Sequence, residues 1–362
     1  MRLDIEEIAQ ANARMNSEGY TQNPASLLPM DHRFHALDAW LRATLPGTDF
    51  RLEPASADAS FRRYFRVFAA AGPTRIAMDA PPERENSAAF VRVAALLAEA
   101  GLNAPRVLAQ DLAQGFLLLS DLGTLPYIVA LREASDVGRL LGDATDALLR
   151  WQAASRAGVL PEYDEALLRR ELTLFPDWYV ARHLGVELTA AQRVALEGVF
   201  AAVLARNLAE PRVYVHRDYM PRNLMVCEPN PGILDFQDAV HGPISYDVAS
   251  LFRDAFISWD EERVLDGTIR YWEKARKAGL PVRADFADFW RDVEWMGLQR
   301  HLKVLGIFAR LKYRDGKAGY LEDEPRFVAY VRHAVGRYRE LAPLGRLLDD
   351  LEGRKPQARL SF

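Results

Sequence analysis

The stretch HRDYMPRN at residues 216–223 decides the fold of this chain, and the triplet DFQ follows it at residues 235–237. Runs of β-favouring residues enter and leave the stretch at 213–215 and 224–227, and a third run at 233–234 precedes the triplet. A proline–glycine pair turns the chain between the second and third runs. The pattern predicts strand, loop, strand, turn and strand, which would present the polar side chains of both motifs near one edge of a small sheet.

Three side chains of these motifs have the chemistry that phosphoryl transfer from ATP requires. Asp218 can act as the catalytic base, because a carboxylate must accept or orient the proton of the attacking hydroxyl. Asn223 and Asp235 offer the amide and carboxylate oxygens with which proteins hold Mg²⁺ on nucleotide phosphates. The order H-x-D-x-x-x-x-N and then D-F-x is the signature set of kinases, with Gln237 where glycine usually stands. Three chemical requirements coincide at workable spacing, so we interpret the motifs as a phosphoryl-transfer site rather than as ordinary loop residues.

Length and composition narrow the class of protein. A chain of 362 residues favours two domains or lobes, and 49% hydrophobic with 27% charged residues is typical of a soluble globular protein. A net charge of −4 gives no support for a nucleic-acid or anionic-membrane partner, and no apolar run approaches the ~18 residues that a membrane span needs. One cysteine excludes an internal disulfide framework and fits a reducing cytoplasm. We therefore expect a cytoplasmic protein with a small-molecule partner and no obligate protein partner.

We expect four regions along the chain. Residues 1–29 are acidic early, then polar with prolines, and predict a loosely attached extension rather than a signal peptide. Residues 30–120 predict a small lobe on the nucleotide side. Residues 121–352 predict a helical lobe with the catalytic loop and the acceptor pocket, and residues 353–362 form a tail.

The hydrophobic pattern predicts the fold of both lobes. Five β-favouring runs with one amphipathic helix predict the small lobe, and helical periodicity dominates after the hinge at 120–123. The expected fold is α+β, bilobal and protein-kinase-like, with a small five-stranded antiparallel sheet in the N-lobe and a large, mainly helical C-lobe. The five runs lie at residues 50–53, 64–68, 75–78, 106–109 and 115–119, the helix at 85–100, and the later helices at 136–156, 164–184, 189–208, 246–256, 261–278, 284–313 and 325–340.

Two features of the small lobe depart from protein kinases. The loop at 55–60 has no glycine, although its small and hydroxyl residues could still let backbone N–H groups approach phosphates; an ordinary solvated turn is an equal reading. The third strand, at 76–80, has no basic residue where a phosphate-pairing lysine is expected. Ser60 and Arg63 are the candidate nucleotide contacts from this region, and the sequence leaves Arg62, Arg63, Arg66 and Arg75 all open as sources of the missing charge.

The chain resembles the aminoglycoside phosphotransferase and choline kinase superfamily. That family lacks the protein-kinase lysine two residues after the catalytic Asp, as here with Met220, and FLLLSDLG at 116–123 is similar to its hinge. ISYDVA at 244–249 is similar to the segment that follows its metal-binding Asp. Within the superfamily, the chain is most similar to the bacterial anomeric kinases of peptidoglycan recycling. The stretches that carry this likeness are MDAPPE (78–83), HRDYMPRNLMV (216–226), PGILDFQDAVHGPISYDVASLFRDAF (231–256), QRHLKVLGIFARLKYRDGK (299–317) and YLEDEPRF (320–327).

The resemblance implies roles for the nucleotide side of the site. Asp218 would be the catalytic base, and Asn223 with Asp235 would bind Mg²⁺. His216 and Asp247 would support the catalytic loop. ATP would be the phosphoryl donor, and the hinge would offer it the Ser120 carbonyl and the Leu122 N–H for adenine.

The resemblance also suggests residues on the acceptor side. Arg222 could offset charge on the transferring phosphate, although a surface salt bridge is an equal reading. Trp178 lies in FPDWY at 175–179 and could stack on a sugar face, although a large aromatic among helices is more often part of the core. Arg300 or His301 could meet the lactyl carboxylate of N-acetylmuramate.

The implied activity is that of an ATP-dependent sugar kinase, which transfers the γ-phosphoryl group to the anomeric (C1) hydroxyl of N-acetylmuramate and/or N-acetylglucosamine in cell-wall recycling. An aminoglycoside or other small-molecule hydroxyl phosphotransferase is the first alternative. It would need a strongly acidic cleft for a polycation, and the basic residues at 300–314 argue against that. A catalytically inactive kinase-fold binding module is the second, supported by the missing lysine and opposed by the intact Asp218, Asn223 and Asp235.

Overall fold

The structure is a computed structural model that describes residues 32–57, 61–133, 136–254 and 256–353. The expected extension at the N-terminus, the tail from residue 354 on and the candidate Ser60 lie outside these residues. The chain divides into two compact units. Unit 1 comprises Met1–Leu125 and Met225–Asp238, and unit 2 comprises Pro126–Leu224 and Ala239–Phe362.

Unit 1 contains a five-stranded antiparallel sheet, which confirms the predicted sheet. Its strands follow the order β1-β2-β3-β5-β4, so that the fifth strand inserts between the third and fourth. Arg63 lies opposite Asp79, and Tyr64 lies opposite Met78. The strands are β1 (Phe50–Ala57), β2 (Arg63–Ala69), β3 (Arg75–Asp79), β4 (Val107–Asp111) and β5 (Phe116–Ser120).

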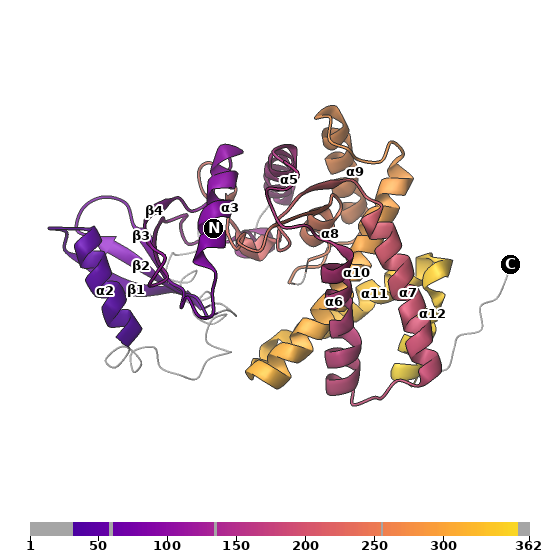
Figure 1. Ribbon diagram of the computed structural model, residues 1–362. Helices are drawn as coiled ribbons and strands as arrows, with labels where there is room; N and C mark the ends of the chain where they lie inside the picture. Colours follow the sequence, from indigo (N-terminus) through magenta and orange to yellow (C-terminus); the bar gives the residue numbers. More distant parts are fainter. Residues whose placement is uncertain (1–31, 58–60, 134–135, 255, 354–362) are drawn as a thin grey trace. The chain divides into compact units, whose positions relative to one another are not determined.

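The two faces of this sheet carry different helices. Successive strand residues point to opposite faces, so Ala77 shares a face with Phe65 and Val67, while Met78 points the other way. Helix α2 (His32–Thr44) lies beside the sheet in Figure 1. Its Leu37 and Leu41 pack in one core cluster with the side chains of the first face. Helix α3 (Ser87–Glu99) borders the second face, where its Phe90 lines a pocket together with Met78.

The segment Met225–Asp238 packs with unit 1, although the sequence places it within the helical lobe. Val226 N–H donates to the Leu125 carbonyl at 2.8 Å, and Asn103 Nδ2 donates to the Pro229 carbonyl at 2.6 Å. The ring of Phe236 lies 4.7 Å from that of Phe90 on α3. These contacts build the DFQ triplet into unit 1.

Unit 2 is mainly helical, as predicted. The expected helix at 164–184 consists of α6 (Glu165–Leu174) and a nine-residue π-helix, η2 (Phe175–His183). Gly306 lets α10 approach the end of α6 closely, because a Cβ at this position would lie 2.4 Å from the Leu174 backbone. The other elements are α4 (Tyr127–Glu133), α5 (Val137–Ala153), α7 (Ala190–Leu208), β6 (Arg212–Val215), η3 (Pro221–Asn223), β7 (Leu224–Met225), β8 (Gly232–Ile233, in unit 1), β9 (Val240–Pro243), α8 (Tyr246–Phe252), α9 (Glu261–Lys277), α10 (Phe286–Asp315), η4 (Ala318–Asp323), α11 (Glu324–Arg337), η5 (Arg339–Leu341) and α12 (Ala342–Leu351).

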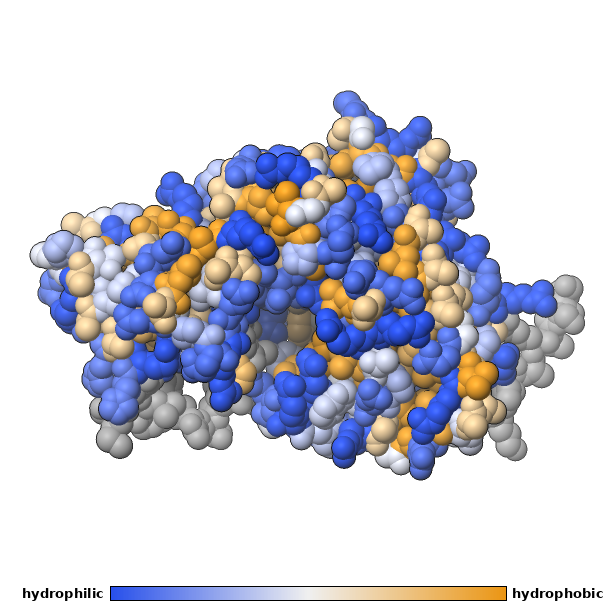
Figure 2. Space-filling model, viewed as in Figure 1, coloured by the Kyte–Doolittle hydropathy of each residue, from blue (hydrophilic) through white to orange (hydrophobic). Residues whose placement is uncertain are grey.

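Polar and charged residues dominate the surface visible in Figure 2, as the 27% of charged residues in the sequence leads one to expect. The face drawn in Figure 2 is mainly hydrophilic, and its hydrophobic side chains lie in separate patches. Within the described part of the chain, no helix combines the length and apolar character needed to cross a membrane.

Candidate active site

The catalytic loop follows β6, which pairs with β9, and two buried contacts hold the loop in place. The carboxylate of Asp247, on α8, accepts hydrogen bonds from the backbone N–H of His216 at 2.6 Å and of Arg217 at 3.0 Å. Tyr219 O–H donates to the Ala144 carbonyl on α5 at 2.8 Å. Arg217 has a φ of 76°, a left-handed conformation that non-glycine residues rarely adopt. Strained backbone of this kind clusters at functional sites, where the surroundings enforce it.

Asp218 lies partly exposed at the centre of this loop, among cations. Burial raises the pKa of the Asp218 carboxyl, because the charged form loses water. The positive charges of Lys303, then Arg217 and Arg300, lower that pKa by a larger amount, so the pKa of Asp218 lies below its ordinary value. Its own N–H donates to Nδ1 of His216 at 3.3 Å. The carboxylate is therefore ionised and oriented, as a proton acceptor must be.

Lys303 belongs to a buried charged cluster that the sequence analysis does not identify. Its ammonium lies 3.3 Å from Glu171 of α6 and donates to the Tyr246 hydroxyl at 3.1 Å. Glu171 also accepts from the Tyr163 hydroxyl and pairs with Arg217. Burial raises the pKa of Glu171, but Lys303 and then Arg217 outweigh it and keep this carboxylate ionised. Glu171 thus joins Lys303 of α10 to Arg217 of the catalytic loop.

The Lys303→Met variant should move the acidic limb of the pH–kcat/KM profile to higher pH. Lys303 is the largest charge that lowers the pKa of Asp218, and activity is lost as pH falls through that pKa. Without Lys303 the pKa of Asp218 rises, so protonation begins at higher pH. The Lys312→Met variant, on the same helix α10, is the matched control and should keep the parent profile. An unchanged acidic limb in Lys303→Met would contradict the electrostatic role.

Asn223 is oriented by the loop that precedes it. Its backbone N–H donates to the Met220 carbonyl at 2.8 Å, and its side-chain Nδ2 donates to the Asp218 carbonyl at 2.9 Å. Because the amide nitrogen faces Asp218, the amide oxygen faces away from it. An oriented amide oxygen fits a hard cation such as Mg²⁺.

Asp235, in unit 1, also adopts a left-handed conformation, with a φ of 60°. Its Oδ1 accepts from Gln237 Nε2 at 2.9 Å and lies 3.6 Å from Nη2 of Arg62. Gln237 therefore orients this carboxylate from the position where kinases usually have glycine. The side chain of Asp235 offers oxygen donors, as the amide of Asn223 does in its own unit, and oxygen donors suit Mg²⁺ better than a softer metal.

The hinge is anchored by an arginine of β2. Arg66 donates to the two carboxylate oxygens of Asp121 at 2.6 and 3.2 Å and to the Gly123 carbonyl at 2.9 Å. Ser120 and Leu122, the candidates for adenine binding, flank Asp121 and line a hollow of about 670 Å³ in unit 1. Arg66 thus fixes the hinge backbone.

Arg63, the second candidate nucleotide contact, lies in an ion pair with buried Asp79 of β3. Arg33 of α2 donates to the same carboxylate from Nε at 2.8 Å. The guanidinium of Arg63 is therefore held toward the face of the sheet that α2 covers.

The acceptor-side candidates have different environments within unit 2. Arg222 is exposed, and its guanidinium lies 4.9 Å from the centre of the Phe256 ring. Trp178 is half-buried on the π-helix η2, a rare element that is frequent at functional sites. The Tyr179 hydroxyl donates to Glu324 of α11 at 2.6 Å and fastens η2.

Arg300 and His301 are both buried on α10. Arg300 lies with its Nη2 3.6 Å from the Met220 sulfur, next to the catalytic loop. The His301 ring packs against Phe327 and Tyr330, with ring centres 5.5 and 4.8 Å away. Burial, and then the charge of Arg300, lower the pKa of His301 far below its ordinary value. Its imidazole is therefore neutral, so of the two only Arg300 can offer a charge to an acidic sugar.

The model of the phosphotransferase enzyme family matches residues 51–286. The chain is 53% identical over 331 residues to the N-acetylmuramate/N-acetylglucosamine kinase of Pseudomonas aeruginosa, covering 89% of this chain and 97% of that one. It is 52% identical over 320 residues to the kinase of the same name from Neisseria meningitidis, covering 88% and 95%.

Solved structures agree with the fold. An ethanolamine kinase of Plasmodium vivax has a TM-score of 0.62 at 9% identity and covers 91% of this chain and 95% of its own. A putative aminoglycoside phosphotransferase of Ralstonia eutropha has a TM-score of 0.60 at 15% identity and covers 86% and 98%. At such identities the likeness concerns the fold alone, which is the predicted kinase-like fold.

Proposed function

The chain belongs to the phosphotransferase enzyme family, and from that membership we propose that it is an ATP- and Mg²⁺-dependent kinase of the anomeric hydroxyl of N-acetylmuramate and N-acetylglucosamine. The observation that carries the choice of acceptor is the identity of 53% to a kinase with that name over 97% of its length. The arrangement of Asp218 supports the chemistry, because an ionised carboxylate stands at the catalytic-loop position of the kinase pattern.

The proposed reaction balances through one proton acceptor. Asp218 takes the proton of the C1 hydroxyl while the C1 oxygen bonds to the γ-phosphorus, the bond from that phosphorus to the β–γ bridging oxygen breaks, and ADP leaves. An anomeric hydroxyl is more acidic than an ordinary alcohol, so one placed carboxylate suffices. General base assistance of this kind contributes about 10²- to 10⁴-fold to the rate.

The remaining residues position and neutralise charge. Asn223 and Asp235 would hold Mg²⁺, which neutralises charge on the nucleotide phosphates. Lys303, Arg217 and Arg300 keep Asp218 ionised. The Ser120 carbonyl and the Leu122 N–H would receive adenine at the hinge, and Ser60 and Arg63 remain proposed contacts of the nucleotide. His216 and Asp247 hold the catalytic loop.

On the acceptor side, Arg300 would meet the lactyl carboxylate of N-acetylmuramate, because it offers a buried positive charge near the catalytic loop. His301 could add a hydrogen bond but no charge. Trp178 would stack on the sugar ring, and Arg222, exposed beside Asn223, would offset charge on the transferring phosphate.

A coupled assay that measures ADP release with each of a panel of acceptors tests the substrate class. N-acetylmuramate and N-acetylglucosamine should each support release, whereas kanamycin and choline should give no more than the rate without acceptor. Removal of Mg²⁺ by EDTA should abolish release, and added Mg²⁺ should restore it. Turnover of kanamycin or choline above that of both sugars would overturn the proposed acceptor.

A further inference from the structure

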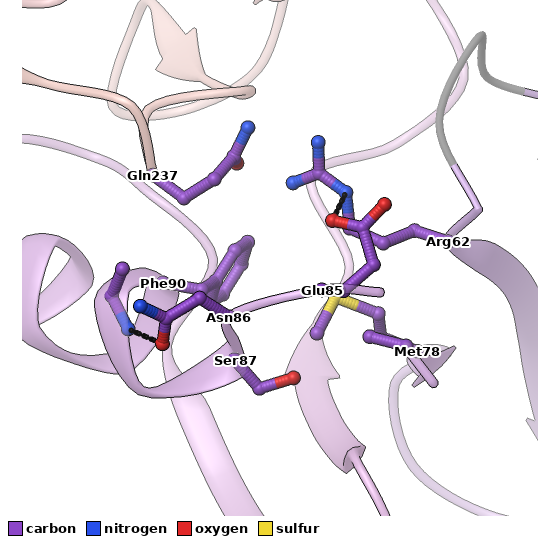
Figure 3. Close-up of a pocket in the computed structure, with 9 residues that line it drawn as sticks. Arg62, Met78, Glu85, Asn86, Ser87, Phe90 and Gln237 are labelled. Atoms are coloured by element: carbon purple, nitrogen blue, oxygen red, sulfur yellow. Dashed lines mark hydrogen bonds and ion pairs between the residues drawn. The ribbon is translucent and has the colours of Figure 1, made fainter. Parts of the chain in front are cut away.

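Strand β3 offers Met78 at the place where a lysine would pair with nucleotide phosphates. Met78 points to the face of the sheet that α3 borders, and it lines a pocket of about 50 Å³ with Phe90 of that helix. Figure 3 shows that Arg62 enters the same pocket from the chain segment just before β2. Its side chain is only 9% exposed, so this pocket contains a cation that comes from the segment before β2 rather than from β3.

Two carboxylates flank the guanidinium of Arg62. Its Nε lies 3.6 Å from Oε2 of Glu85, and its Nη2 lies 3.6 Å from Oδ1 of Asp235. Both are ion-pair distances, longer than the 2.7–3.2 Å that is usual for a hydrogen bond. Two ion pairs therefore help to hold the guanidinium in position.

Glu85 is itself fixed by the chain that carries Arg62. Its Oε1 accepts from the backbone N–H of Phe61 at 3.0 Å, while Oε2 faces Arg62. Glu85 lies two residues before α3. In protein kinases, the glutamate that pairs with the third-strand lysine lies within a helix of the small lobe. One carboxylate thus ties the start of β2 to the α3 side of the pocket.

The other three arginines that the sequence leaves open have other positions. Arg63 pairs with Asp79, and Arg66 holds Asp121 at the hinge. Arg75 shares its face of β3 with Ala77, the face that α2 covers. Of the four, Arg62 is the one that lines the pocket with Met78 and Asp235's partner Gln237.

We propose that Arg62 is the residue that pairs with the nucleotide phosphates in place of the missing third-strand lysine, and that Glu85 is its positioning residue. A planar guanidinium presents a fork of donors that matches phosphate oxygens and carries a permanent charge. The inference rests on the proposed function only in taking a nucleotide as the ligand, and it does not depend on which sugar is the acceptor.

ADP binding measured by calorimetry in EDTA tests Arg62 without any contribution from a metal ion. The Arg62→Gln variant should bind ADP about 10- to 100-fold more weakly than the parent, the range expected for a lost charge-assisted hydrogen bond. Arg62→Lys keeps the charge and should lose less. Arg75→Gln, the matched control from β3, should bind ADP as the parent does. Adenosine, which has no phosphate, should bind all four proteins equally.

A double-mutant cycle tests the role of Glu85. If Glu85 acts by placing Arg62, Glu85→Gln should weaken ADP binding by itself but add little in the Arg62→Gln background. Two fully additive losses would show that Glu85 acts independently and would overturn its positioning role.

Two results would overturn the assignment of Arg62. One is parent-like ADP binding by Arg62→Gln, and the other is an equal loss of adenosine and ADP, which would place the effect on the fold. Neither result depends on the acceptor. If the parent enzyme failed to phosphorylate amino sugars, the proposed function would be wrong, but the ADP affinities would still test the role of Arg62.

Discussion

The Asp218→Asn variant is expected to turn over about 10²- to 10⁴-fold more slowly than the parent while binding ADP at least as well. Asparagine keeps the shape of the side chain but cannot accept the proton of the acceptor hydroxyl. It also removes a negative charge near Lys303, Arg217 and Arg300, so less negative charge opposes the binding of the anionic nucleotide. A fall in kcat with retained nucleotide affinity therefore identifies Asp218 as a base rather than a binding residue.

Steady-state kinetics with N-acetylglucosamine, together with ADP calorimetry, would measure both quantities on the same preparation. Asp266→Asn is the matched control, because Asp266 forms an exposed ion pair with Arg270 on α9, and this variant should keep the parent kcat. Loss of ADP affinity in Asp218→Asn with kcat unchanged would contradict the catalytic assignment.

The small lobe could be predicted in detail because its strands have a clear local pattern. Each β-favouring run is short and bounded by turns, and the predicted five-stranded antiparallel sheet is confirmed. The place of Met225–Asp238 could not be predicted, because it depends on distant contacts such as the Phe90–Phe236 ring pair. Helical periodicity also cannot distinguish α6 from the π-helix η2, since both bury the same kinds of residue.

The hydrophobic pattern does not predict helices α4 and α12 of unit 2. Helix α4 has seven residues, which is too short for a helical period to stand out after the hinge. Helix α12 has ten residues and begins directly after the short element η5, beyond the end of the predicted helix at 325–340.

The chemistry-bearing motifs were visible in the sequence, but their partners were not. Lys303 stands three residues after Arg300, so one turn of α10 relates them, and that spacing was the available signal. Glu171 gave no local signal, because its role arises only where α6 meets the catalytic loop. The left-handed backbone at Arg217 and Asp235 also has no local cause, since neither residue is glycine. The surrounding contacts impose it.

The choice among four arginines shows the same limit. Arg62, Arg63 and Arg66 lie within five positions of one another, and no local pattern distinguishes one of them from the others. Strand alternation and the partners Glu85, Asp79 and Asp121 separate them in space.

The fate of the reducing end distinguishes phosphorylation at C1 from phosphorylation at any other hydroxyl of the sugar. A product phosphorylated at C1 has no free reducing end, whereas a product phosphorylated at C6 keeps one. With ATP and N-acetylmuramate, reducing-sugar signal should therefore fall mole for mole with ADP release. The methyl glycoside of the same sugar is the matched control, because it has every hydroxyl except the anomeric one, and it should not be phosphorylated at all.

Reducing-sugar signal and ADP should be measured together in the same reaction, at time points spanning full conversion. If phosphorylation occurs at C1, the loss of reducing sugar should equal the ADP released with N-acetylmuramate, and the methyl glycoside should give no ADP release. ADP release with the reducing-sugar signal unchanged, or comparable turnover of the methyl glycoside, would contradict anomeric phosphorylation.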